Sequence, residues 1–358
     1  MRAGVDAAGR PHLLQGLMTS PDIHLQKIGV IRNAALLVSI DPPKVREANF
    51  LDDRILTPNT PRQWVSLDAA IEQASAITDS VPLHFIFHSG HVGSTLVSRL
   101  LDEVNGVLTL REPYVLRQLA EAHEVVHLPE SYVAPEVLDR YFDSLLKLWG
   151  RGFANTTTVI VKAASSSARI APLLLAKRPQ ARAIFLSADA ETYITTFLSN
   201  PDSLIDLRVM APERIRRLLS FGIASPKALH QMSQGELAAM AWLVESWTHQ
   251  KAVASAPGQV MLIDFDELLN DPKKSLGAIW RHFGLPCDEA ALSRIISSPV
   301  LSRYSKDPAH AFSTQTRAQI LADSRNRHQE QIRRGLQWIK LLGSANAEAA
   351  RVVHPYGQ

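Results

Sequence analysis

Hydrophobic positions along the chain follow two different patterns. Short runs rich in aliphatic and β-branched residues, bounded by Gly, Pro or polar residues, are typical of buried strands. Runs of this kind lie at residues 34–40, 83–87, 107–110, 156–161, 181–187 and 260–263. Elsewhere apolar residues recur every three or four positions, which predicts amphipathic helices. We expect helices at about 67–76, 94–104, 136–148, 169–176, 191–198, 235–253, 275–283 and 314–338.

Strands that alternate with helices favour a parallel sheet with right-handed crossovers. We therefore predict an α/β fold of three layers, in which helices flank a central parallel sheet. Residues 1–80 carry no chemical motif and are predicted to be an N-terminal structural extension. Residues 41–63, which contain four prolines, are predicted to be a long loop. The main domain is expected at 81–358, with a helical insertion at about 200–255 and a helical C-terminal cover at about 300–342.

Composition and charge exclude several classes of protein. The 358 residues are 46% hydrophobic and 20% charged, and a formal net charge of +3 does not indicate a nucleic-acid partner. The single cysteine, Cys287, excludes an internal disulfide and a cysteine metal cluster. We find neither an apolar run long enough to span a bilayer nor a signal peptide, and therefore expect a cytoplasmic protein. The basic helix at 214–217 is expected to be a solvated face.

The segment after the run at 83–87 carries the clearest chemistry. Residues 88–93, His-Ser-Gly-His-Val-Gly, form a loop with two glycines, and a Ser-Thr pair then begins a helix. Glycines let the backbone approach an anion, and the unpaired N–H groups at a helix N-terminus attract it. The residues predicted to bind phosphate are Gly90, His91, Val92, Gly93, Ser94 and Thr95. A plain turn between a strand and a helix is the alternative for this stretch alone.

The loop departs from the nucleotide P-loop pattern G-x-x-x-x-G-K-[ST]. His88 stands at the first Gly, and Ser94 stands at the Lys. Kinases and ATPases use that Lys on the β- and γ-phosphates. The pattern thus predicts a P-loop NTPase-like fold but disfavours ordinary phosphoryl transfer, and a P-loop kinase stays an alternative.

Two ionisable residues follow predicted strands. Glu112 comes after the strand at 107–110, and Lys162 ends the strand at 156–161. Ligands of α/β proteins bind at the carboxyl ends of parallel strands, so both residues are candidates for acid–base or anion chemistry. The alternatives are a Glu112 that pairs with Arg111 or caps a helix, and a Lys162 that is an exposed surface residue. Asp264 and Asp266 are predicted to be turn and cap residues rather than metal ligands.

The order of these pieces resembles the sulfotransferase family, the enzymes that use 3′-phosphoadenosine 5′-phosphosulfate (PAPS). Residues 91–96, HVGSTL, are similar to the family's phosphosulfate loop, [KR]-S-G-[ST]-T followed by an apolar residue. Glu112 lies where the tyrosylprotein branch has its base carboxylate. Residues 161–162 and 185–197 are similar to the strand and helix that hold the 3′-phosphate. Residues 261–272 and 283–286 are similar to the late segment v-x-Y-E-d-L…d-P…F-l-G-l-p.

The resemblance implies an activity and roles for individual residues. PAPS would be the donor substrate, no metal would be needed, and a small molecule, sugar, lipid or peptide would accept the sulfuryl group. Glu112 would be the base, and His91 and Lys162 would offset charge on the leaving phosphate. The family's 3′-phosphate Ser falls on Thr196, whereas its 3′-phosphate Arg falls on Ala188. A catalytically inactive nucleotide-binding protein is therefore a further alternative, and the sequence does not indicate an oligomeric state.

Overall fold

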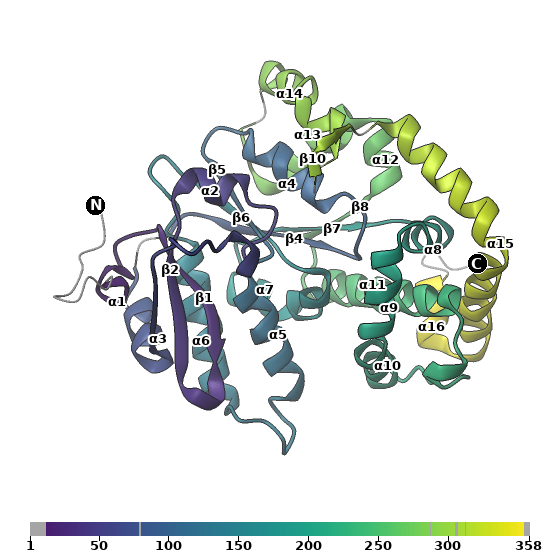
Figure 1. Cartoon of the computed structure of the whole chain (residues 1–358), viewed down its shortest axis with the longest axis horizontal. Helices are drawn as coiled ribbons and strands as arrows, with labels where there is room; N and C mark the ends of the chain where they lie inside the picture. The colour runs from purple at the N-terminus through teal and green to yellow at the C-terminus, as the bar shows by residue number, and fades with distance from the viewer. Residues whose placement is uncertain (1–11, 79, 287, 305–306, 312, 354–358) are drawn as a thin grey trace.

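A five-stranded parallel sheet lies at the centre of the protein (Figure 1). The computed structural model describes residues 12–78, 80–286, 288–304, 307–311 and 313–353. The strands are β4 (Leu83–His88), β5 (Val107–Arg111), β6 (Thr158–Lys162), β7 (Ala183–Ser187) and β8 (Val260–Asp264), in the order β5-β6-β4-β7-β8. Every neighbouring pair in this sheet is parallel. The predicted α/β fold class with a central parallel sheet is confirmed.

Helices cover both faces of this sheet and complete the three layers (Figure 1). Because strand side chains alternate between faces, Phe85 and Phe87 join one hydrophobic core and Ile86 joins another. The first face is covered by α5 (Tyr114–Val125), α6 (Pro135–Trp149) and α7 (Ala171–Lys177), and the second by α4 (Ser94–Asp102), α13 (Pro272–Phe283) and α14 (Glu289–Ile296). The central strands β4, β6 and β7 are mostly apolar because both of their faces are buried.

A second, antiparallel sheet stands before the parallel one in the chain. It contains β1 (Ile23–Gly29), β2 (Ala34–Ser39) and β3 (Arg62–Ser66), accompanied by α1 (Leu13–Gly16), α2 (Pro42–Glu47) and α3 (Leu67–Ser75). The sequence predicted β2 and α3, and Ser66 caps α3 as expected for a helix start. The predicted loop at 41–63 is wrong in part, because Pro42 and Pro43 begin α2. Proline is tolerated in the first turn of a helix, where its missing N–H would have no partner.

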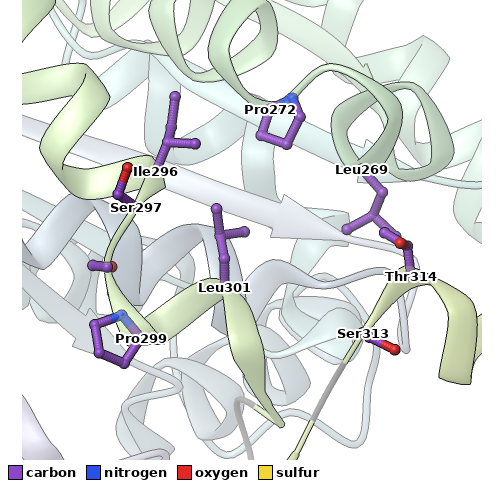
Figure 2. Close-up of a pocket in the computed structure, with 9 residues that line it drawn as sticks. Leu269, Pro272, Ile296, Ser297, Pro299, Leu301, Ser313 and Thr314 are labelled. Carbon is purple, nitrogen blue, oxygen red and sulfur yellow. The ribbon is translucent and has the colours of Figure 1, made fainter.

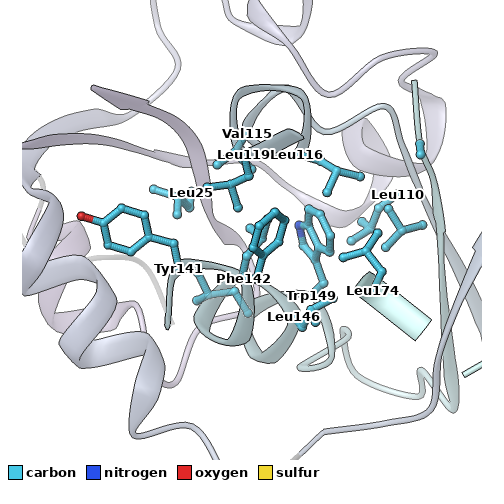
Figure 3. Packing of buried hydrophobic residues seen from close by; sticks show 14 of the residues in the cluster. Leu25, Leu110, Val115, Leu116, Leu119, Tyr141, Phe142, Leu146, Trp149 and Leu174 are labelled. Atoms are coloured by element: carbon cyan, nitrogen blue, oxygen red, sulfur yellow. The ribbon is translucent and has the colours of Figure 1, made fainter. Parts of the chain in front are cut away.

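The antiparallel sheet shares its core with the helices below the parallel sheet. Part of this core is shown in Figure 3, where Leu25 of β1, Leu116 of α5, and Phe142 and Trp149 of α6 belong to the same cluster. All four side chains are buried in one continuous cluster. The antiparallel sheet is thus packed into the main body through a shared hydrophobic core.

Helices from the second half of the chain form a third core. They are α8 (Ala190–Leu198), α9 (Pro201–Val209), α10 (Ala211–Ser220), α11 (Gln234–Ser255), α15 (Thr314–Ala345) and α16 (Ala347–Val353). The helix α12 (Phe265–Asn270) follows β8, and a short strand pair, β9 (Arg303–Tyr304) with β10 (Asp307–Ala311), precedes α15. The expected cover at about 300–342 includes α15, but residues 305–306 and 312 lie outside the described part of the chain. Within that part, we find no helix both long and apolar enough to cross a membrane.

Two arginines of the basic helix predicted to be a solvated face are buried, while Arg216 is exposed. Arg214 and Arg217 of α10 are 6% and 5% exposed. Arg217 pairs with Glu245 of α11 at 2.9 Å, and Arg214 pairs with Asp206 of α9 at 3.1 Å. The prediction is wrong because carboxylates from other helices, which the local charge run does not reveal, compensate the buried guanidinium groups.

Buried histidines make stability depend on pH. Burial lowers the pKa of His24 and His249 to about 3 and that of His84 to about 4. In the unfolded chain a histidine has a pKa of about 6.5. The unfolded state therefore binds protons that the folded state excludes. The stability that these groups contribute is complete above pH ~6.5 and is lost as the pH falls toward about 3.

We predict that His249→Leu reduces the loss of stability between pH 7 and pH 5, because it removes one of these groups. Urea unfolding at several pH values measures the effect. His230→Gln, at an exposed histidine, is the matched control and should leave the pH dependence unchanged. Equal pH slopes in His249→Leu and in the unaltered protein would contradict the assignment.

Candidate active site

The loop at residues 88–93 lies at the carboxyl end of the central strand β4. Chain connections leave toward opposite sides of the sheet from this point, which is where α/β proteins bind ligands. Gly90 and Gly93 have φ values of 101° and 69°, in the left-handed region that favours glycine. At Gly93 the packing is also close, because an added Cβ would lie 1.9 Å from the ring of Phe265. Both glycines are therefore required by the shape of the loop.

His88 joins the loop to the neighbouring strand ends. Its Nδ1 accepts a hydrogen bond from the N–H of Gly90 at 3.1 Å. Its Nε2 lies 3.0 Å from the carbonyl of Ala163, so the proton sits on Nε2 and the ring is neutral. The same Nε2 is 3.9 Å from Oε1 of Glu112. One buried imidazole thus contacts the loop and comes close to the candidate base.

Glu112 and Lys162 form an ion pair at the ends of adjacent strands. The N–H of Glu112 also donates to the carbonyl of Lys162 at 2.6 Å. The surface-lysine alternative is wrong, because Lys162 is fully buried. The Arg111 alternative is wrong as well, because Arg111 pairs with Asp102. The Glu112 side chain remains 19% exposed, so its carboxylate is the member of the pair that a substrate can reach.

Backbone strain is concentrated at two of the predicted site residues. Among the described residues, the non-glycine positions with positive φ are Asn33, His91, Glu112 and Asn155. Asn adopts this region readily, whereas His91 at 54° and Glu112 at 49° do so less often. Residues held in such conformations cluster at functional sites, where the surrounding structure enforces them.

Two buried hydroxyl groups at the loop have no hydrogen-bond partner in the part of the chain that the structure describes. Ser94 and Thr95 occupy the first turn of α4 and are 5% and 3% exposed. The Oγ1 of Thr95 and the Oγ of Ser89 are buried and have no hydrogen-bond partner among the described residues. Buried hydroxyls are normally paired, and an oxyanion in the loop would supply an acceptor for them. These atoms, with the N–H groups that begin α4, fit a phosphate or sulfate group.

Helix α8 packs against the loop through its aromatic side chains. The hydroxyl of Tyr193 donates to the carbonyl of Ser89 at 2.9 Å, and burial raises the pKa of Tyr193. Phe197 contacts His91 edge-on at a ring distance of 4.7 Å. His91 also places its Nε2 3.3 Å from Oγ of Ser203 on α9. Sequence reasoning placed Tyr193 in the segment 185–197 without a role of its own and missed Ser203, which nothing local distinguishes from other helical residues.

Thr196 occupies α8, one residue before Phe197. Its Oγ1 donates to the carbonyl of Thr192 at 2.7 Å, which leaves its lone pairs rather than its proton for another group. Ala188, at the start of the same region, is 7% exposed, and its carbonyl accepts a hydrogen bond from Trp242 Nε1. Neither residue supplies a cation, so neither replaces the 3′-phosphate Arg of the sulfotransferase motif.

The late segment reaches the loop through Phe265. Asp264 accepts hydrogen bonds from the N–H groups of Asp266 and Glu267, so it is the predicted cap of α12. The guanidinium of Arg317 lies 5.1 Å from the ring centroid of Phe265 and pairs with Asp266. Sequence reasoning missed Arg317, which comes from the distant helix α15. Two segments about fifty residues apart therefore meet on the far side of Gly93.

A separate pocket lies at the N-terminus of α15. Figure 2 shows this pocket, which has a volume of about 520 Å³. It is lined by Leu269, Pro272, Ile296, Ser297, Ser298, Pro299, Leu301, Ser313 and Thr314. None of the predicted site residues lines it. No set of three or more His, Cys, Asp or Glu side chains suited to a metal comes together within the described ranges.

Comparisons with known proteins give matches only among solved structures. No family model matches the chain, and no curated protein matches it. The chain is similar to the sulfotransferase domain from the curacin biosynthetic pathway, with 13% identity and a TM-score of 0.41, over 70% of this chain and 98% of that one. It is also similar to mouse sulfotransferase SULT7A1 complexed with PAP, with 10% identity and a TM-score of 0.38, over 80% of this chain and 93% of that one.

A third match is the sulfotransferase from Alicyclobacillus acidocaldarius, with 11% identity and a TM-score of 0.40, over 78% of this chain and 96% of that one. All three are sulfotransferases, the family that the sequence motifs resemble. Identities and TM-scores this low assign no donor, acceptor or catalytic residue to this chain.

We predict that Gly93→Ala weakens anion binding at the loop at least about tenfold, because the new Cβ meets Phe265 and adds strain at φ 69°. Calorimetric titration with inorganic pyrophosphate measures the binding. Gly284→Ala is a matched control, since Gly284 has φ 68° and no atom within 4 Å of the added Cβ. Equal weakening in both variants would mean that the loop is not the anion site.

Proposed function

We propose that this protein transfers a sulfuryl group from PAPS to a hydroxyl or amine of an acceptor. The observation that carries the proposal is the placement of Glu112. Its carboxylate is partly exposed, paired with the buried Lys162, and 3.9 Å from the His88 ring that holds the loop. A base beside an anion-binding loop is the arrangement that in-line transfer from an anionic donor requires.

The loop would hold the 5′-phosphosulfate of the donor. Its N–H groups and the unpartnered Thr95 hydroxyl supply donors, and Gly90 and Gly93 let the anion approach the backbone. Val92 and Ser94 complete the segment. This set fits a phosphosulfate without a metal, because the donors come from the chain itself. Thr196 is proposed to contact the same nucleotide from α8.

The reaction would proceed as a direct displacement at sulfur. Glu112 accepts the proton of the acceptor hydroxyl or amine as its oxygen or nitrogen forms the bond to sulfur. The bond between sulfur and the bridging oxygen of the donor breaks, and the electron pair stays on the leaving 5′-phosphate. Lys162 and His91 offset the charge that develops there. The products are the sulfated acceptor, 3′-phosphoadenosine 5′-phosphate (PAP) and a proton held by Glu112.

Ala188 supports a second candidate, a nucleotide-binding protein without catalytic activity. Without the Arg of the family motif, a bidentate clamp on the 3′-phosphate is missing. The two candidates differ in turnover, and both differ from a kinase in the nucleotide that they bind.

We predict that PAP raises the melting temperature of the protein more than ADP or ATP–Mg²⁺ does, because the site would read the 3′-phosphate. A ligand that binds only the folded state adds about 2.7 kcal/mol at a hundredfold excess over its Kd. Thermal-shift titration measures this. A shift with ATP–Mg²⁺ alone would favour a kinase instead. The absence of a shift with PAP would refute the proposed sulfuryl transfer.

We predict that Glu112→Gln lowers turnover by about a hundredfold or more and leaves PAP binding within about twofold, because the amide cannot accept a proton but its oxygen can still accept the hydrogen bond of Lys162. The measurement is PAP released from PAPS with a panel of phenol, sugar and amine acceptors. Glu121→Gln, at an exposed glutamate on α5 that pairs with Arg117, is the control and should keep full turnover. A Glu112→Gln variant that turns over normally would remove Glu112 from the mechanism.

A further inference from the structure

The segment that leads from α2 toward β5 is tied to the parallel sheet. The buried Arg111 donates to the carbonyls of Arg46 at 2.9 Å and Ala48 at 3.1 Å. Arg46 in turn donates to the carbonyl of Val107 at 3.0 Å, and Arg99 donates to Asn49. The N-terminal region, expected from the sequence to be a structural extension, therefore runs along the edge strand of the candidate site.

Leu51 brings this segment to the candidate base. Its N–H donates to the carbonyl of Arg111 at 2.7 Å, and its carbonyl accepts from the N–H of Tyr114 at 3.1 Å. These two backbone bonds bracket Glu112 on both sides. The residues that follow Leu51 are consequently fixed next to the carboxylate rather than elsewhere on the surface.

Arg54 is the cation that this arrangement places beside Glu112. Asp52 accepts hydrogen bonds from Nε of Arg54 at 2.9 and 3.0 Å and also from Nη2. The guanidinium carbon lies 3.5 Å from the ring centroid of Phe50. The hydrogen bond to Asp52 raises the pKa of Arg54, and the charge of Glu112 contributes to the same shift. Arg54 lies three residues after Leu51, so the backbone bonds of Leu51 also keep Arg54 near Glu112.

Asp52 orients the guanidinium of Arg54 but leaves part of it available for a ligand. Asp52 occupies the edge formed by Nε and Nη2, and Phe50 covers one face. The Nη1 edge has no partner among the described residues, and the side chain is 61% exposed. An ion pair this exposed contributes little to stability. Its effect is to hold a guanidinium with one donor edge open, in the end-on geometry that binds carboxylate and phosphate oxygens.

Other cations nearby are already engaged. Lys162 is buried and paired with Glu112, and Lys27 pairs with Asp53 of the same loop. An acceptor that reaches Glu112 therefore meets a carboxylate that repels anions and the open Nη1 edge of Arg54, which attracts them. An oxyanion placed at Arg54 would position the acceptor while its nucleophilic group lies at Glu112.

We propose that Arg54 binds an oxyanion carried by the acceptor, so that acceptors of this protein bear a carboxylate, phosphate or sulfate group beside the hydroxyl or amine that is sulfated. The proposal rests on the proposed role of Glu112 in sulfuryl transfer. It gives the N-terminal segment a part in substrate selection through the pair Phe50–Arg54 and the clamp of Asp52.

Calorimetry on the full chain saturated with PAP tests the proposal with three probes: 4-hydroxyphenylacetate, its uncharged amide and 4-hydroxybenzylphosphonate. We expect the carboxylate or the phosphonate to bind at least about tenfold more tightly than the amide, the gain typical of a charge-assisted hydrogen bond. Arg54→Gln should abolish this preference and leave the affinity for the amide unchanged. Arg117→Gln, at an exposed arginine paired with Glu121 at 2.9 Å, should keep it.

The tighter of the two charged probes identifies the oxyanion class, and either result supports the proposal. Equal binding of all three probes, no binding of any of them, or a preference that survives Arg54→Gln would overturn it. PAP binding is measured first, and its absence would count against the proposed function alone. The probe titrations would then be run on the ligand-free protein, so the Arg54 result is obtained in either case.

Discussion

A buried ammonium group needs a carboxylate partner, and the pairing of Lys162 with Glu112 is the interaction on which the candidate site depends. The parallel register places Arg111 opposite Lys162, so Glu112 is the first residue beyond the paired strands. Its N–H still donates to the carbonyl of Lys162, and its side chain then turns back to the ammonium. The register of the sheet therefore determines the position of the Glu112 carboxylate, the partly exposed member of the pair.

The strain at His91 and Glu112 shows how the surroundings hold this arrangement. A left-handed backbone at a non-glycine residue costs on the order of 1–3 kcal/mol and persists only where neighbouring contacts enforce it. The bonds of Leu51 and Lys162 fix the backbone around Glu112, and the bond from Gly90 to His88 fixes the loop before His91. The site is thus shaped before any ligand arrives, which reduces the ordering that binding requires.

The sequence was sufficient to predict the central sheet but not the contacts between distant segments. Apolar runs identified each strand of that sheet, because strands buried on both faces leave a strong local signal. The loop glycines and the ionisable residues at strand ends could be identified because they directly follow these strands in the sequence. In contrast, Arg54 reaches the region because nearby Leu51 bonds to the distant Arg111, Arg317 reaches it through Asp266, and Arg217 is buried by Glu245 of another helix. Such pairings depend on tertiary packing, which periodicity does not encode.

The N-terminal segment illustrates why structural and functional roles are difficult to separate in this fold. β5 is an edge strand, and an uncovered edge invites pairing with other chains. Leu51 covers the end of that edge through backbone hydrogen bonds, which any residue except proline could make. The side chains that follow Leu51 do not take part in these backbone bonds. Arg54 contributes little to stability because its ion pair is exposed. Next to Glu112 the edge is therefore covered by the backbone of Leu51, whereas the chemistry presented there is set by the side chain of Arg54, which these backbone bonds do not require.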